Sequence, residues 1–204
     1  MAEWFQLHSR QVTYGAVAVI VLVGGAWFYN RSESLKSQRA DHAYFLAQQS
    51  IPGNLPLAES DLQKMITRYD GTSAALQAQL TLAQLYYDQA KYQQGIESLK
   101  KSMPKLQKSK DFESAGHLLL ASGYEQMKKF LDAASEYALA AKADRFDQDR
   151  QRHESAEARA YLLAGRTDTA KEIWTRLAAD SKGTVAGEAR VRLGELTAMP
   201  EPKS

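Results

Sequence analysis

The sequence predicts an all-α protein in which a single N-terminal transmembrane helix precedes an α-solenoid of about three to four helical hairpins. Residues 11–30 include no charged residue, and a helix of that length matches the thickness of a bilayer. After Arg31, apolar residues recur at helical spacing, and short breaks with Gly, Asp or Pro separate the runs. A pattern of small and aromatic residues then returns at intervals of 37 to 38 residues, which is typical of stacked helical repeats.

The predicted span lies between Arg10 and Arg31 and holds 20 residues, of which fourteen are apolar. Because a helix rises ~1.5 Å per residue, about 20 residues cross the ~30 Å hydrocarbon core. A cleaved signal peptide and a buried core helix are the alternatives. The run is longer than the apolar region of a signal peptide and ends in bulky rings, so we expect an uncleaved anchor. Aromatic residues, which favour the headgroup layer, flank it: Tyr14, Trp27, Phe28 and Tyr29.

Charge is distributed unevenly along the chain. Residues 1–40 hold four basic and two acidic side chains, whereas residues 41–204 hold 22 of each. The neutral main body disfavours a nucleic-acid-binding surface. Basic residues after the span outnumber those before it, so the positive-inside rule alone favours a cytoplasmic C-terminal domain. The residues counted are Arg10 on one side and Arg31, Lys36 and Arg39 on the other.

The remaining elements are predicted from apolar periodicity and from the breaks between runs. Pro52, Gly53 and Pro56 mark a loop, and Gly71 followed by Thr72 marks a helix end and a new N-cap. The expected helices cover residues 33–50, 57–69, 73–89, 92–106, 111–128, 130–143, 148–164, 167–179 and 184–198.

Three of the resulting hairpins are similar to one another. Each has a small residue, a tyrosine one turn later, and a second small residue in the following helix: Ala83, Tyr86 and Gly95; Ala121, Tyr124 and Ala133; Ala158, Tyr161 and Ala170. We expect these nine residues to pack the repeats, because small side chains allow helices to cross closely. The pattern resembles the tetratricopeptide repeat (TPR), with its W-x2-L-G-x2-Y and A-x3-F signature. It departs from that signature at the first Trp, which is replaced by Gln79, His117 and Glu154.

The whole arrangement resembles the bacterial ancillary translocon-subunit family. The features that carry this resemblance are a short tail, one span ending in aromatic residues, and the segment YDGTSAA leading into TPR hairpins. The resemblance implies a single-pass protein of the inner membrane whose periplasmic TPR domain assists the secretion translocon and periplasmic chaperones. It therefore implies a periplasmic C-terminal domain, against the local charge count, and we follow the resemblance. The expected organisation is a tail (1–10), a transmembrane helix (11–30), a connecting helix and loop (31–56), a TPR-like domain (57–199) and a polar tail (200–204).

The sequence offers no constellation of catalytic or metal-ligating residues. The chain has no Cys and 4 His, and none of the four has a partner that forms a convincing metal site at helical spacing. Phosphate-binding and nucleophile motifs are absent as well. We therefore expect no enzyme activity, no cofactor and no metal. The expected partners are the bilayer, through residues 11–30, and other proteins: translocon or envelope factors and exported chains.

Partner binding is expected on the first helix of each hairpin, on the face opposite the packed Ala and Tyr positions. Such faces line the concave groove in which helical solenoids bind their partners. The predicted groove residues are Gln77, Leu80, Gln84, Tyr87, Leu118, Ser122, Glu125, Arg152, Ser155 and Arg159. The sequence thus predicts a membrane-tethered adaptor in protein secretion or periplasmic chaperoning. A TPR coordinator of envelope growth, division or outer-membrane assembly is the alternative.

Overall fold

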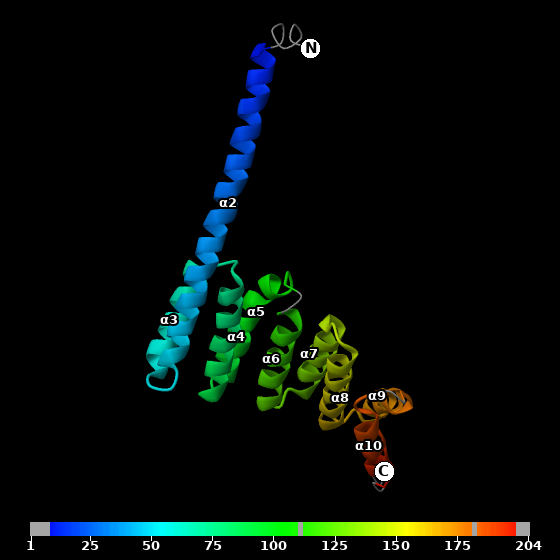
Figure 1. Cartoon of the computed structure of the whole chain (residues 1–204). Helices are drawn as coiled ribbons and strands as arrows, with labels where there is room; N and C mark the ends of the chain where they lie inside the picture. The colour runs from blue at the N-terminus through cyan, green and yellow to red at the C-terminus, as the bar shows by residue number, and fades with distance from the viewer. Residues whose placement is uncertain (1–8, 110–111, 181–182, 199–204) are drawn as a thin grey trace.

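The computed structural model describes residues 9–109, 112–180 and 183–198, and within these ranges it shows nine helices and no strand (Figure 1). Four helical hairpins stack side by side, and a last helix packs on the fourth. The all-α solenoid predicted from the sequence is confirmed. The helices are α2 (Ser9–Ser50), α3 (Leu55–Arg68), α4 (Ser73–Asp88), α5 (Tyr92–Leu106), α6 (Glu113–Gln126), α7 (Phe130–Ala143), α8 (Asp147–Leu163), α9 (Thr167–Ala179) and α10 (Ala186–Ala198).

Helix α2 is a single helix of 42 residues. It joins the predicted span and the connecting helix without a break, although the sequence suggested a boundary near residue 31. Its C-terminal part packs on α3 and α4, where Ala40 and Ala47 are buried, and its N-terminal part projects far from the solenoid (Figure 1). The helix continues because the polar residues after Asn30 are compatible with an exposed helix.

The predicted transmembrane helix over residues 11–30 is not found in the described part of the chain, where no helix combines enough length and apolarity to cross a membrane. Apart from Tyr14, the apolar side chains described there run from Val17 to Tyr29, about 20 Å of helix against a ~30 Å hydrocarbon core. Residues 1–8 of the predicted N-terminal tail and the predicted tail over residues 200–204 lie outside the described residues.

The same turn closes the second, third and fourth hairpins. Its left-handed residue is Ala90, Lys128 or Gly165, with φ of 58°, 58° and 76°. In each hairpin the next amide donates a hydrogen bond to the carbonyl of the repeat tyrosine, as Lys91 does to Tyr86 at 2.8 Å. This is the Schellman arrangement, which satisfies the last carbonyls of the helix. The repeat tyrosine therefore serves the hairpin through its backbone as well as its ring.

Three clusters of buried side chains follow one another along the solenoid. The first joins α2, α3 and α4, the second joins α4 to α8, and the third joins α8, α9 and α10. Eight of the nine predicted repeat-packing residues are buried, and Tyr161 is half-buried against two of the clusters. The buried eight are Ala83, Tyr86, Gly95, Ala121, Tyr124, Ala133, Ala158 and Ala170.

Tyr87 packs tightly at the junction between the second and third hairpins. Its ring lies where a Cβ on Gly95 of α5 or on Gly123 of α6 would overlap it, so both positions need glycine while the ring stays in place. The hydroxyl donates to the carbonyl of Leu119 at 3.1 Å. Burial raises the pKa of this hydroxyl well above its ordinary value. Tyr87 thus connects the hairpin α4–α5 to the hairpin α6–α7.

We expect Gly123→Ala to lower the free energy of unfolding by about 1–3 kcal/mol, because the new methyl group overpacks the site against Tyr87 and Ile96. The matched control is Gly187→Ala, since a Cβ at Gly187 in α10 meets nothing within 4 Å. That control should be neutral or stabilising, because Ala favours a helix by up to ~1 kcal/mol over Gly.

Urea unfolding followed by circular dichroism measures both variants. Combining Gly123→Ala with Tyr87→Leu should cost less than the two single changes together, because the smaller side chain leaves room for the methyl group. Equal stability of Gly123→Ala and the wild type would contradict the close contact.

Candidate functional site

The predicted groove residues lie on α4, α6 and α8, and they differ widely in exposure. Four are exposed: Gln77, Gln84, Arg152 and Arg159. Four are half-buried: Leu80, Leu118, Ser122 and Glu125. The remaining two, Tyr87 and Ser155, are buried. The face is therefore open mainly at its amide and arginine positions.

The structure corrects the prediction for Tyr87 and Ser155. Tyr87 is only 7% exposed, because its ring fills the junction with α6. Ser155 is 2% exposed, and its hydroxyl accepts a hydrogen bond from the indole N–H of Trp174 at 3.4 Å. Assigning faces at 100° per residue from a single packed side overestimates the exposed face of a helix. Helix α4, for example, contacts α2, α3, α5 and α6 at once.

The polar residues that remain on this face hold defined partners. Gln84 donates to Asp88 at 2.8 Å, and Arg152 lies 3.5 Å from the carboxylate of Asp149. Glu125 accepts a hydrogen bond from the hydroxyl of Tyr137 at 3.0 Å. Burial and the charge of Glu125 raise the pKa of this tyrosine, and Arg159 opposes the rise. This surface offers amide, carboxylate and guanidinium groups to a polypeptide, together with the partly exposed side chains of Leu80 and Leu118.

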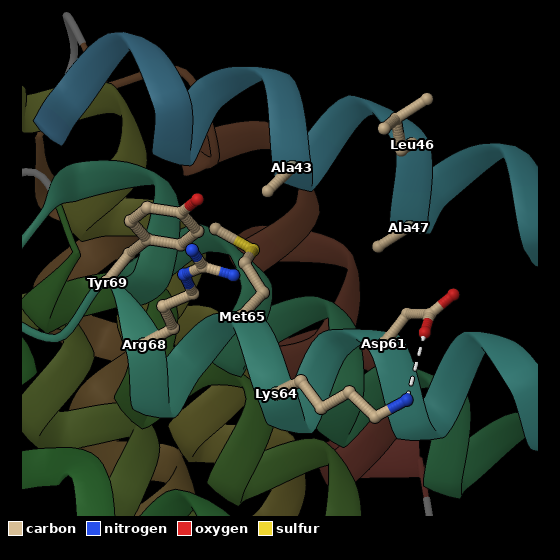
Figure 2. Close-up of a pocket in the computed structure, with 8 residues that line it drawn as sticks. All are labelled: Ala43, Leu46, Ala47, Asp61, Lys64, Met65, Arg68 and Tyr69. Atoms are coloured by element: carbon tan, nitrogen blue, oxygen red, sulfur yellow. Dashed lines mark ion pairs between the residues drawn. The ribbon is translucent and has the colours of Figure 1, made fainter. Parts of the chain in front are cut away.

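A second candidate surface is a shallow pocket of about 300 Å³ between α2 and α3, at the start of the solenoid (Figure 2). Its apolar lining residues include Ala43, Ala47 and Met65. The charged residues at its edge include Asp61 and Lys64, whose side chains lie 3.6 Å apart. Leu46 reaches its edge with 49% of its surface exposed. The complete lining is Ala43, Leu46, Ala47, Asp61, Lys64, Met65, Arg68 and Tyr69.

Sequence reasoning missed this pocket, although a signal for it exists. Phe45 and Leu46 are consecutive apolar residues in a helix whose opposite side is already buried through Ala40 and Ala47, so they have no place in the same core. The described residues place no hairpin ahead of α2 and α3, so this side of the first hairpin is left open. The pocket can accept an apolar side chain of a partner, with charged groups available around it.

The residues in place of the TPR tryptophan form polar links within the hairpins. Gln79 donates to Ser98 at 2.8 Å between α4 and α5, and His117 Nδ1 lies 2.7 Å from Glu136 between α6 and α7. Between α8 and α9, Glu154 accepts from Arg176 at 2.9 Å. The departures from the signature thus share one structural role, which is to tie the two helices of a hairpin.

The titratable groups of the interior serve packing in the same way. Asp144, at the end of α7, accepts hydrogen bonds from Ser114, and it lies 2.6 Å from Nδ1 of His153 in α8. In the ranges that the structure describes, no three His, Asp or Glu side chains gather as a metal site. The hydrogen bonds of Asp144 thus hold α7 against α6 and α8.

Stacked helical hairpins that follow one another along the chain define a helical-repeat protein. The chain belongs to the family described as tetratricopeptide repeat-like domain, whose sequence profile matches residues 2–183. Domains of this kind typically act as non-catalytic scaffolds for protein–protein interaction. The particular translocon-subunit family suggested by the sequence is not shown by this match. The search among curated proteins found no match.

Two similar solved structures come from one fungal protein. The chain resembles the nearly identical TPR-like repeats of a Podosopora anserina protein assigned as a kinesin light chain, with 18% identity and a TM-score of 0.60. A point variant of that protein gives 17% identity and a TM-score of 0.59. Each match covers 78% of this chain and 85% of the other. At such low identity, the likeness establishes the fold alone.

One carboxylate on the third repeat is placed unfavourably. Glu157 occupies the position of Leu82 and Leu120 in the other repeats, and it is half-buried. Burial raises the pKa of its carboxyl group, the charge of Arg176 lowers it, and the charge of Glu154 raises it further. The folded protein therefore holds this proton more tightly than the unfolded chain does, and ionisation destabilises the fold.

We expect Glu157→Gln to stabilise the protein at neutral pH by less than about 1 kcal/mol, because the half-exposed carboxylate is partly solvated. The gain should disappear below the ordinary glutamate pKa of 4.5, where the carboxyl is protonated in both states. Urea unfolding of both proteins from pH 3.5 to pH 7 measures the difference. A gain that does not grow as the pH rises would contradict the raised pKa.

Proposed function

We propose that this chain is a non-catalytic adaptor that holds protein partners at a membrane surface. The observation that carries this proposal is the form of α2, which belongs to the solenoid core at one end and projects from it at the other (Figure 1). A scaffold built in this way attaches its binding face rigidly to whatever receives the projecting part. Tethering raises the effective concentration of the binding face for partners at the same membrane.

The projecting part of α2 is apolar on all sides. Nine large apolar or aromatic side chains between Val17 and Tyr29 are 53–72% exposed, and the described chain covers none of them. A helix that is apolar all round belongs in a protein core or in lipid rather than in water. Although the described residues alone fall short of a span, the uncharged sequence continues back to residue 11. This continuation supports membrane attachment through residues 11–30. The nine are Val17, Val19, Ile20, Val21, Leu22, Val23, Trp27, Phe28 and Tyr29.

We further propose that the adaptor assists protein secretion or periplasmic chaperoning at the translocon of an inner membrane, with its solenoid in the periplasm. The support for this role is the resemblance of the tail, span and YDGTSAA segment to the ancillary translocon-subunit family. The competing role, coordination of envelope growth, division or outer-membrane assembly, uses the same repeats and predicts different partners.

Membrane attachment predicts that the full chain floats with vesicles in a density gradient and resists extraction at alkaline pH. Val19→Arg combined with Leu22→Arg should release it, because each charge costs about 2.5–3.5 kcal/mol in the centre of a membrane helix. The matched control, Leu139→Arg, changes an exposed leucine on α7 and should stay bound.

A periplasmic solenoid predicts that protease added to spheroplasts removes it. Survival of the solenoid would contradict a periplasmic placement, and failure to float would contradict attachment itself.

A photoreactive residue on the open face tests the partners. We expect substitutions at Gln84 and at Arg159 to give crosslinks with translocon subunits or exported chains in membranes, because both side chains are exposed on the first helices. Glu172, exposed on the second helix of the last hairpin, is the matched control and should give none. Crosslinks to division or cell-wall factors alone would favour the competing role. Equal labelling from all three positions would contradict binding on this face.

A further inference from the structure

Basic side chains gather at the end of the solenoid from which α2 projects. Lys36 of α2 donates to the carbonyl of Asp70 at 2.8 Å, and Lys105 of α5 donates to the carboxylate of Asp70 at 2.7 Å. The residues beside this junction are mostly basic as well. We call the following six residues the basic rim: Arg31, Lys36, Arg39, Arg68, Lys105 and Lys108.

Shared neighbours place five members of the rim together, and Arg31 precedes Lys36 by five residues on α2. Arg39 and Arg68 both border hollows that Tyr69 also lines, and Lys108 borders a hollow with Asp70 and Lys105. All six side chains except Lys36 belong to exposed residues, and Lys36 is half-buried. The acidic residues among them are Glu33, Asp41 and Asp70, so the local charge is +3. This excess contrasts with the neutral balance of residues 41–204 as a whole.

The excess is local rather than a property of this whole end of the solenoid. The turn between α7 and α8 lies at the corresponding end of a later hairpin, where α7 ends and α8 begins. Residues 142–154 around this turn hold four acidic and four basic side chains. An excess of positive charge therefore lies beside the projecting helix, whereas the charges at the α7–α8 turn are balanced.

The distance from the apolar part of α2 suits the headgroup layer. Lys36 follows Tyr29 by seven residues, which is about 10 Å along the helix. The polar layer of a bilayer is about 5–8 Å thick on each side, and a lysine side chain extends several ångströms from its backbone. If the apolar part of α2 occupies the hydrocarbon core, the rim reaches the phosphate groups of that leaflet.

A hollow beside the rim adds groups that suit an anionic headgroup. It measures about 390 Å³ and includes Lys105, Lys108, Ser73 and Ser109 in its lining. Ammonium and hydroxyl groups are hydrogen-bond donors to phosphate oxygens. Asp70 is the acidic group in the same lining, and its carboxylate is hydrogen-bonded to Lys105. Lys108 is therefore the lysine of this lining that is not paired with Asp70.

We propose that the basic rim binds anionic phospholipid headgroups of the membrane that holds α2, and thereby sets the tilt of the solenoid on that membrane. This inference rests on the membrane attachment proposed above. Each basic residue near an anionic surface changes the binding equilibrium by about fivefold, and salt screens the attraction. Loss of two rim lysines should therefore lower the ratio of docked to undocked solenoid by about twenty-fivefold.

The test uses the full chain in vesicles of phosphatidylcholine, with or without added phosphatidylglycerol. Because the chain has no Cys, Gln107→Cys gives a single attachment site for a donor dye beside the rim, at an exposed residue outside the lining of the hollow. Energy transfer to an acceptor dye on the lipid headgroups reports how closely the rim approaches the membrane. We expect higher transfer with phosphatidylglycerol, and loss of that increase at about 0.5 M salt.

Lys105→Gln combined with Lys108→Gln should remove most of the increase, whereas the matched pair Lys128→Gln and Lys129→Gln, at the opposite end of the hairpins, should retain it. Equal transfer in neutral and anionic vesicles would overturn the proposal, as would equal loss from both pairs of substitutions. Flotation of the same samples separates the two proposals. A chain that floats but ignores lipid charge contradicts only the rim, whereas a chain that does not float contradicts membrane attachment.

Discussion

The stacking of this solenoid depends on one tyrosine ring held between two glycines. Tyr87 leaves α4 between Gly95 and Gly123, and its hydroxyl reaches a backbone carbonyl of α6, so its ring fills the junction between the second and third hairpins. In a solenoid each hairpin contacts mainly its neighbours, and every later hairpin inherits the orientation set at earlier junctions. The direction of α8, α9 and α10 relative to α2 therefore follows from this junction.

Within the second, third and fourth hairpins, polar contacts complement the apolar packing. The tyrosine carbonyl closes the turn, and a buried or half-buried polar residue on the first helix reaches the second helix, as His117 does to Glu136. Buried polar groups favour one arrangement because any other leaves them without partners. Apolar clusters of Ala, Leu and Tyr tolerate small shifts between helices, and these polar links limit such shifts. These links therefore help to fix the arrangement of the two helices within each of these hairpins.

The fold was predictable because its determinants repeat along the sequence. The alanines and tyrosines at intervals of 37 to 38 residues identify the hairpins, and Gly71 and Gly165 mark two of their ends. The open face was less predictable. Tyr87 and Ser155 lie on the expected side of their helices, yet neighbouring helices enclose them, and periodicity alone does not show how many neighbours a helix has. The pocket between α2 and α3 depends on the same tertiary information.

Because α2 is continuous, the number of residues between its apolar part and the solenoid fixes the distance between the two. No turn or glycine separates Tyr29 from Ala40, so this stretch acts as a fixed-length spacer between the apolar part and the first buried residue of the solenoid. Each residue inserted there would lift the solenoid by ~1.5 Å and rotate it by about 100°. A full turn of added helix would raise the binding face and restore its direction, whereas half a turn would point it away from the same partner. The length of this stretch thus sets both the distance of the solenoid from the apolar part of α2 and the direction in which its binding face points.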